Sequence, residues 1–139
     1  MIVADSNLVA YLLIPGEKSE LADRIFKQDS TWVAPLLCRS ELRNILTLYM
    51  KKEGMSLAQA QRTIEKAESL LRNREYAVPS DKVLEMANRH HITACDAEFV
   101  VLAKQFAVPL LTFDGPLRKA CPEIAMDPEK FRSSPRCKR

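Results

Sequence analysis

The chain opens with a short apolar run that stops at a carboxylate, and this feature constrains the fold more than any other. Residues Met1 to Ala4 are apolar, Asp5 follows them, and Ser6 and Asn7 are both good N-cap residues for a helix. The pattern predicts a buried, central strand that ends at Asp5. In an open α/β sheet, ligands bind beyond the carboxyl ends of the strands, so we expect Asp5 to face a functional site.

Patterns typical of helices and strands alternate along the rest of the chain. Helices are predicted over residues 6–14, 19–28, 37–52, 56–73, 80–90 and 93–106. Further strands are predicted over residues 31–34, 76–78, 109–113 and 124–126. Such alternation is typical of a mostly parallel sheet with helices on both faces. We therefore expect an α/β fold whose central sheet has four to five strands.

Length and charge indicate one compact domain, over residues 1–131, followed by a basic tail. Four of the 21 basic side chains and none of the 18 acidic ones lie in residues 132–139, which leaves 17 basic and 18 acidic side chains before the tail. The domain itself is not a uniformly basic nucleic-acid binder, so attraction for a polyanion requires local patches, bound cations or the tail. The tail is predicted to be a disordered, solvated terminus, with RNA contact as the alternative.

The cysteines are typical of a protein in a reducing compartment, and the apolar runs do not indicate a membrane span. Cys38, Cys95, Cys121 and Cys137 stand far apart and form no metal-ligand pair, so free thiols are the simplest interpretation. The apolar run from residue 8 to residue 14 is too short to span a membrane and has no signal-peptide flank. We expect a soluble, cytoplasmic protein.

Acidic residues occur at four positions that the predicted fold can bring together. Asp5 and Asp114 end apolar strands, Asp96 lies in the first turn of a helix, and Glu41 lies soon after the start of another. Each has a structural alternative: Asp5 can cap a helix, Glu41 suits a helix dipole, Asp96 fits a capping-box variant after Thr93, and Asp114 before a glycine is a turn signal. Jointly, all four can face one end of the sheet.

Four carboxylates at one edge repel one another unless cations neutralise them, and Mg²⁺ or Mn²⁺ is the natural partner of oxygen ligands. Such a site can bridge a phosphate oxygen and activate water, which suits phosphodiester hydrolysis. Asn7 and Thr112 are expected to be supporting polar residues. Arg39 and Arg43 are candidate nucleic-acid contacts, although surface ion pairs are the alternative. The sequence predicts catalytic and metal-binding roles for Asp5, Glu41, Asp96 and Asp114.

The chain resembles the PIN-domain ribonucleases, and among them the VapC-like toxins of toxin–antitoxin pairs. The resemblance covers residues 1 to about 126 and is carried by Ile2-Val3-Ala4-Asp5-Ser6-Asn7, Ser40-Glu41-Leu42, Thr93-Ala94-Cys95-Asp96-Ala97 with Leu102-Ala103, and Leu110-Leu111-Thr112-Phe113-Asp114. It implies a three-layer sandwich in which the four acids bind Mg²⁺ or Mn²⁺ and Asn7 and Thr112 support them. It also implies cleavage of single-stranded or loop RNA such as transfer or ribosomal RNA, a homodimer, and silencing by an antitoxin protein.

Other interpretations compete with a nuclease. A PIN-like scaffold that has lost activity could bind RNA or protein, although the presence of all four acids argues against it. Cys95 is a departure from the family, where many relatives carry an aromatic residue before the aspartate. A receiver-type phosphoacceptor would need paired acids after the first strand, and a haloacid-dehalogenase-like phosphatase would prefer an aspartate at position 7, where Asn7 stands.

Overall fold

Five short strands form one parallel sheet in the computed structural model, which describes residues 1–132. In chain order they are β1 (Ile2–Ala4), β2 (Trp32–Pro35), β3 (Glu75–Tyr76), β4 (Leu110–Leu111) and β5 (Ala125–Met126). Their order across the sheet is β3-β2-β1-β4-β5, so β1 is the central strand, as predicted. Val3 pairs with Val33 on one side and with Leu110 on the other. Because all strands run in parallel, their carboxyl ends meet at one edge.

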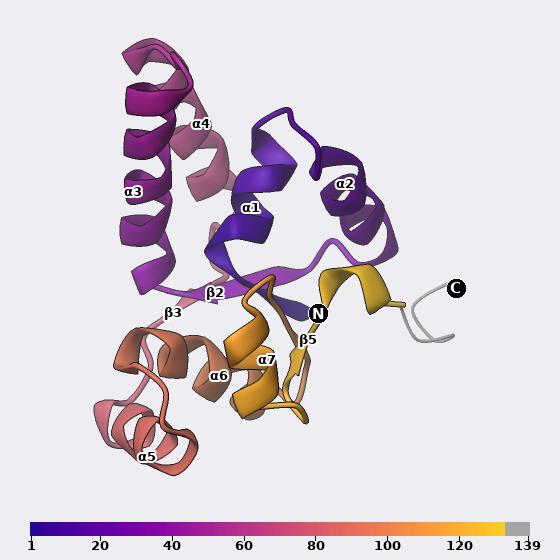
Figure 1. Ribbon diagram of the computed structural model, residues 1–139, viewed down its shortest axis with the longest axis vertical. Coiled ribbons are helices and arrows are strands. Elements are labelled where there is room, and N and C mark those ends of the chain that lie inside the picture. Colours follow the sequence, from indigo (N-terminus) through magenta and orange to yellow (C-terminus); the bar gives the residue numbers. More distant parts are fainter. Residues whose placement is uncertain (133–139) are drawn as a thin grey trace.

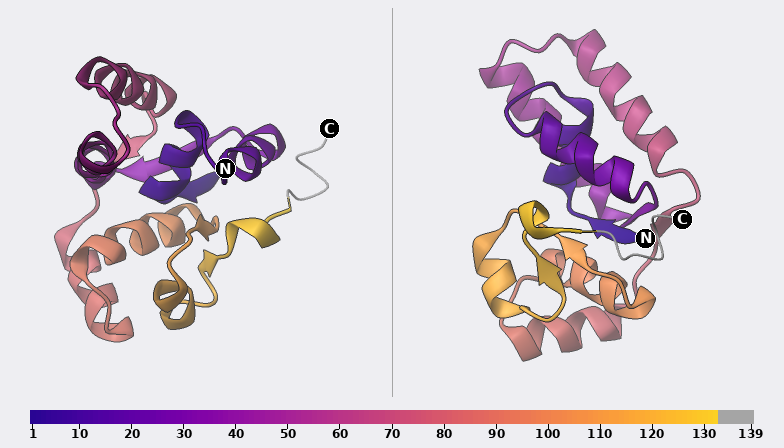
Figure 2. Two further views of the ribbon diagram at one scale, coloured as in Figure 1. Left: turned by 45° about the horizontal axis from the view of Figure 1, so that its top comes forward. Right: turned by 90° about the vertical axis from the view of Figure 1, so that its right-hand side faces the viewer.

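Seven α-helices within residues 1–132 cover the two faces of the sheet (Figures 1 and 2). They are α1 (Ser6–Leu13), α2 (Ser19–Gln28), α3 (Leu37–Lys52), α4 (Leu57–Leu70), α5 (Ser80–His90), α6 (Ala94–Phe106) and α7 (Gly115–Ala120), followed by a short 3-10 helix, η1 (Pro128–Lys130). Helices α1 to α4 lie on one side of the sheet and α5 to α7 on the other, and α6 packs against β1, β2 and β4. The predicted α/β fold with helices on both faces is confirmed.

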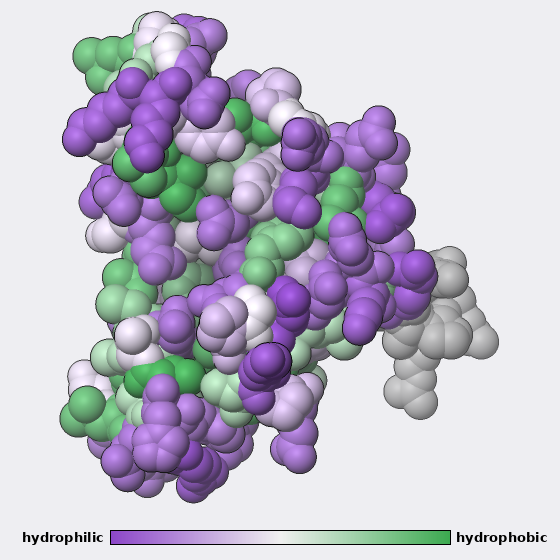
Figure 3. Space-filling view, in the orientation of Figure 1, coloured by the Kyte–Doolittle hydropathy of each residue, from purple (hydrophilic) through white to green (hydrophobic). Residues whose placement is uncertain are grey.

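The core lies on both faces of the sheet and centres on β1. Every residue of β1 is fully buried, as are Trp32 from β2, Leu8 from α1 and Val100 from α6. The buried apolar side chains of the described residues form one cluster, although the domain boundary at residue 131 stays a prediction. The face in Figure 3 is mostly hydrophilic, with apolar residues in small separate areas. No helix within residues 1–132 has the length and apolarity that a membrane span requires.

Some predicted boundaries were wrong, and one helix was missed. Helix α4 ends at Leu70 instead of residue 73, because the chain turns at Asn73 through a left-handed conformation with φ of 62°. Strand β2 includes Pro35, where the prediction stopped one residue earlier. Asp114-Gly115 is not a simple turn, because Asp114 is the N-cap of α7 and Pro116 occupies the first turn of that helix. The tail that was predicted to be disordered comprises Arg132 and residues 133–139. Residues 133–139 lie outside the described residues.

Candidate active site

A cavity of about 270 Å³ opens where the strand carboxyl ends meet, and all four predicted acids line it. Asp5 directly follows β1, and Asp114 lies three residues after the end of β4. Glu41 comes from the second turn of α3, and Asp96 from the first turn of α6. Asn7 and Thr112 line the same cavity. The structure therefore brings together the six residues that were predicted to form the acidic site and its polar support.

Asp5 is fixed by three hydrogen bonds. It caps a helix and also lines the cavity, so its structural role does not exclude a functional one. Its Oδ1 accepts from the backbone N–H of Leu8 at 2.9 Å, which caps α1. Its Oδ2 accepts from Thr112 Oγ1 at 2.6 Å and from the Phe113 N–H at 3.2 Å. Burial raises the pKa of Asp5, and these hydrogen bonds offset part of that rise. The carboxylate is held rigidly at the end of the central strand.

Thr112 joins two of the acids to each other through its hydroxyl. Its side chain is only 1% exposed. While the hydroxyl donates to Asp5, its oxygen accepts from the backbone N–H of Asp114 at 3.1 Å. Arg118 donates to the Thr112 carbonyl oxygen at 2.9 Å, which fastens the segment between β4 and α7. Thr112 is thus a rigid connection between β1 and the start of α7.

Glu41 reaches the cavity from α3 and is half-buried. Its Oε1 accepts a hydrogen bond of 2.7 Å from the hydroxyl of Ser6 in α1. Burial raises the pKa of Glu41, and the negative charges of Asp96, Asp5 and Glu98 raise it further, while the Ser6 hydrogen bond opposes the shift. The chain has gathered carboxylates that repel one another, as the sequence pattern indicated.

Asp96 and Asp114 lie at the starts of two helices, and the charge of Asp114 acts on Asp96. The Asp96 N–H donates to the Thr93 hydroxyl at 3.1 Å, so Thr93 caps α6 as predicted. Asp114 Oδ1 accepts from the Leu117 N–H at 3.0 Å and caps α7. Burial raises the pKa of Asp96, and the charge of Asp114 adds to this effect, while a hydrogen bond with Thr93 opposes it. Both acids stand at the positive ends of helix dipoles, which suits negative charge.

The donor set of the cavity fits a hard divalent cation. Its polar lining consists of oxygen and amide groups, without any lysine, arginine, histidine or cysteine. Within residues 1–132, no three acidic, histidine or cysteine side chains are grouped closely enough to form a ready metal cage. Mg²⁺ is usually held by one or two carboxylates together with waters and substrate phosphates, so such a cage is not required. The residues present therefore fit Mg²⁺ or the similar Mn²⁺.

Sequence reasoning missed two polar residues of the cavity. Ser6 was interpreted as an N-cap, but Asp5 is the cap and Ser6 is buried in the first turn. Asn44 lines the cavity one turn after Glu41, and this spacing of three residues on a helix could have indicated a shared face. Glu98 does not line the cavity, although its charge acts on Glu41.

The two predicted arginine contacts lie outside the lining of the acidic cavity. Arg39 pairs with Glu75 through Nε at 2.8 Å and Nη2 at 2.7 Å, and its Nη1 lies 3.9 Å from Glu68. These ion pairs fasten α3 to β3 and α4, and they raise the pKa of Arg39. Arg43 is exposed on α3. Nucleic-acid contact by either residue stays a prediction.

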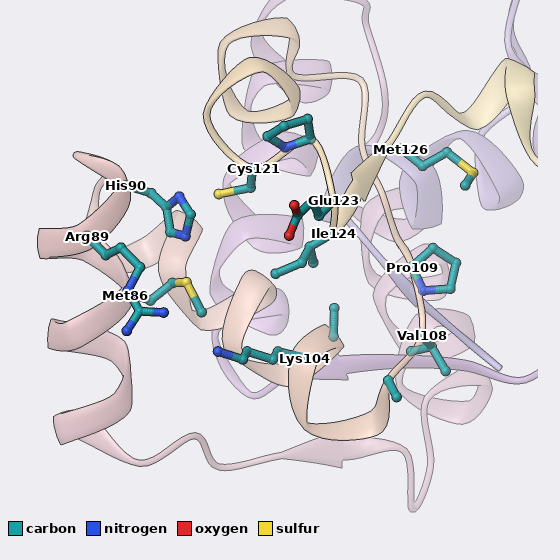
Figure 4. A pocket seen from close by; sticks show the side chains of 13 residues that line it. Met86, Arg89, His90, Lys104, Val108, Pro109, Cys121, Glu123, Ile124 and Met126 are labelled. Atoms are coloured by element: carbon teal, nitrogen blue, oxygen red, sulfur yellow. The ribbon is translucent and has the colours of Figure 1, made fainter.

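A larger cavity, of about 770 Å³, lies between α5, α6 and the segment from Cys121 to Met126, and Figure 4 shows its side chains. Arg89, His90 and Lys104 border it, and none of the four acids of the smaller cavity contributes to it. His90 Nδ1 lies 3.1 Å from the carbonyl oxygen of Ala120, a contact between α5 and α7. We place the candidate active site in the smaller cavity, because that is where the acids converge.

Comparison with known proteins identifies the family. The model of the PIN domain family matches residues 2–121. Ribonuclease VapC3 of Pyrobaculum aerophilum is 27% identical over 126 residues, which cover 88% of this chain and 96% of that protein. FitAcB of Neisseria gonorrhoeae is 19% identical, with a TM-score of 0.68 over 94% of this chain and 100% of that chain.

Two further solved structures share the fold at low identity. PAE2754 of Pyrobaculum aerophilum is 20% identical, with a TM-score of 0.70 over 92% of this chain and 83% of that one. FitAB bound to an IR36 DNA fragment is 16% identical, with a TM-score of 0.73 over 95% and 98%. The family match spans most of the sequence and contains the four acids of the cavity, and these solved structures have the same architecture. This chain belongs to the PIN domain family.

Proposed function

We propose that this protein is a metal-dependent endoribonuclease that hydrolyses phosphodiester bonds in single-stranded or loop RNA. One observation carries the proposal: Asp5, Glu41, Asp96 and Asp114, from four separate elements, line a single cavity. Membership of the PIN domain family and the relative named ribonuclease VapC3 support RNA as the substrate. A scaffold without activity has no need to gather carboxylates whose pKa values are raised by burial and mutual repulsion.

The four acids are the proposed ligands of Mg²⁺ or Mn²⁺. Asp5 uses three of its roughly four acceptor positions within the fold, which leaves one for a ligand. Within residues 1–132, Glu41 Oε2 and Asp114 Oδ2 have no hydrogen-bond partner, while the other oxygen of each is anchored. When bound, the ion would supply Lewis-acid activation of the phosphodiester and of the attacking water.

The remaining side chains hold and orient the reacting groups. Thr112 keeps Asp5 and Asp114 at a fixed separation through its two hydrogen bonds. Asn7 is exposed at the rim of the cavity, where its amide can donate to a phosphate oxygen of the substrate. Arg43, and the part of Arg39 that its ion pairs leave exposed, are the proposed contacts for neighbouring phosphates.

We also propose that the protein is the toxin of a toxin–antitoxin pair, acts in the cytoplasm as a homodimer and is silenced by an antitoxin protein. The similarity to ribonuclease VapC3 and to the FitAB assembly, which was solved on a DNA fragment, supports a partner protein for this chain. A gene for a small DNA-binding protein beside the gene of this chain would favour the pair, whereas its absence would favour a solitary processing nuclease.

Cleavage of RNA by the purified protein tests the proposed activity. A panel of transfer RNAs and a ribosomal stem-loop is incubated with Mg²⁺, Mn²⁺ or EDTA, with wild type, Asp5→Asn and Asp96→Asn. We expect cuts at defined positions that require the metal and that fall at least about 100-fold in rate in both variants, because each removes a negatively charged ligand. Asp81→Asn is the matched control, because Asp81 also lies in the first turn of a helix but outside the cavity.

Two results would contradict the proposal. Full activity in both Asp5→Asn and Asp96→Asn would exclude the acidic site. Wild-type protein that is folded, binds RNA, and neither cuts it nor binds Mn²⁺ would favour the scaffold interpretation instead. Circular dichroism of each variant shows that a loss of activity does not come from unfolding.

A further inference from the structure

Within residues 1–132, only two hydroxyl side chains are buried, and each of them bonds to an acid of the cavity. Thr112 holds Asp5, as described above. Ser6 is 5% exposed, and its Oγ lies 2.7 Å from Oε1 of Glu41. Burying a hydroxyl has a cost unless it is hydrogen-bonded, so the partner that it receives in the core is informative. Ser6 therefore holds Glu41 through a hydroxyl hydrogen bond, in the same way as Thr112 holds Asp5.

The direction of the Ser6 hydrogen bonds follows from proton counting. Its Oγ also lies 3.5 Å from Sγ of Cys38, which is fully buried. A hydroxyl has one proton, and an ionised carboxylate can only accept, so the proton of Ser6 goes to Glu41. Burial, and to a lesser extent nearby carboxylates, raise the pKa of the Cys38 thiol to about 12, so the thiol stays neutral and is a weaker acceptor than the Glu41 carboxylate, to which the Ser6 bond is also shorter.

This arrangement fixes a flexible side chain. Glu41 lies on α3 and Ser6 on α1, so the bond joins two helices that pack against each other. A free glutamate side chain samples many rotamers, and ordering it costs conformational entropy. Ser6 holds Oε1. Oε2 is therefore the one oxygen of the Glu41 carboxylate that has no hydrogen-bond partner among the described residues. The helix contact has therefore restricted Glu41 before any ligand binds.

We propose that Ser6 is a positioning residue, which anchors one oxygen of Glu41 so that the other is presented to the metal ion and the substrate. The inference rests on the proposed function, because it assigns a role toward the ion that this function requires. Groups that orient a metal ligand typically change metal affinity or activity by about 10-fold to 100-fold when they are removed. Ser6 should act through Glu41 and should donate no hydrogen bond to RNA, because its single proton is already used.

The test compares Ser6→Ala with Ser6→Thr, which keeps the hydroxyl, and with Ser19→Ala. Ser19 is a matched control, because its hydroxyl also makes two hydrogen bonds, to the Gly16 N–H and the Ile14 carbonyl, away from the cavity. Titration of the full-length protein with Mn²⁺, followed by electron paramagnetic resonance or calorimetry, measures affinity without any substrate. Cleavage kinetics on the substrate found above give kcat and KM, and urea denaturation measures stability.

We expect the Mn²⁺ dissociation constant of Ser6→Ala to rise at least about 10-fold and kcat to fall by a similar factor, with KM for RNA unchanged. Ser6→Thr should recover most of the affinity, and Ser19→Ala should match wild type. Unchanged affinity and kcat in Ser6→Ala, beside a wild type that binds Mn²⁺ and cuts RNA, would overturn this inference alone. An equal loss in Ser6→Thr would also overturn it. A wild type that neither binds Mn²⁺ nor cuts RNA would overturn the proposed function as well.

Discussion

Replacing Thr112 by valine should destabilise the metal-free protein by an amount that the structure allows us to estimate. Valine has nearly the same shape, so no cavity forms at this fully packed position. The substitution removes the 2.6 Å hydrogen bond to the Asp5 carboxylate and the acceptor of the Asp114 N–H. A hydrogen bond to a charged group contributes about 1.5–3 kcal/mol. We therefore expect the free energy of unfolding to fall by about 2 kcal/mol.

Urea denaturation at neutral pH in EDTA measures this loss, which corresponds to a decrease in melting temperature of about 6–8 °C for a chain of this size. Thr63→Val is the matched control. Thr63 also donates a short hydrogen bond, of 2.8 Å, but to the neutral carbonyl of Gln59 on an exposed part of α4. The control should change the free energy of unfolding by less than about 0.5 kcal/mol. Equal effects of the two substitutions would refute the importance of the bond to Asp5.

Two further predictions concern stability. The metal-free protein should become more stable as the pH falls below neutral, because burial raises the pKa values of Asp5, Glu41 and Asp96 above their unfolded values, so the native state takes up protons before the unfolded chain does. Urea midpoints in EDTA at several pH values measure this, and a midpoint that rises toward pH 7.5 would contradict it. Ala107→Gly should raise the free energy of unfolding by about 0.5–1 kcal/mol, because Ala107 ends α6 in a left-handed conformation with φ of 54° that glycine adopts without strain. A lower melting temperature in this variant would show that the strain is absent.

The acids could be located from the sequence because their positions depend on local rules. A carboxylate that ends a buried strand, such as Asp5, or that opens a helix, such as Asp96, is placed by residues within a few positions of it. The structural roles that were considered as alternatives help to place these acids, because Asp5 and Asp114 each cap a helix at the cavity. The pairing of Ser6 with Glu41 could not be predicted, because it joins residues 35 positions apart and depends on how α1 packs on α3.

The long helices were predicted well and the short elements less well. Helices α2, α3 and α5 have the predicted bounds, because each carries several turns of apolar spacing. The six residues of α7 are too few for an apolar periodicity to predict a helix. Asp114-Gly115 before Pro116 is typical of a turn as well as of a helix start. Strand β4 has only two residues where five were predicted, because pairing with β1 and β5, which the sequence does not encode locally, sets its length.

The bond between Thr112 and Asp5 spans 107 positions of the chain, and this separation has a consequence during synthesis. Asp5 leaves the ribosome 107 residues before Thr112, so it cannot acquire two of its three hydrogen bonds until the segment after β4 has emerged and paired with β1. Asp114, the last of the four acids of the cavity along the chain, is translated in that same segment. A growing chain therefore cannot complete the acidic cavity until the segment that carries Thr112 and Asp114 has been translated.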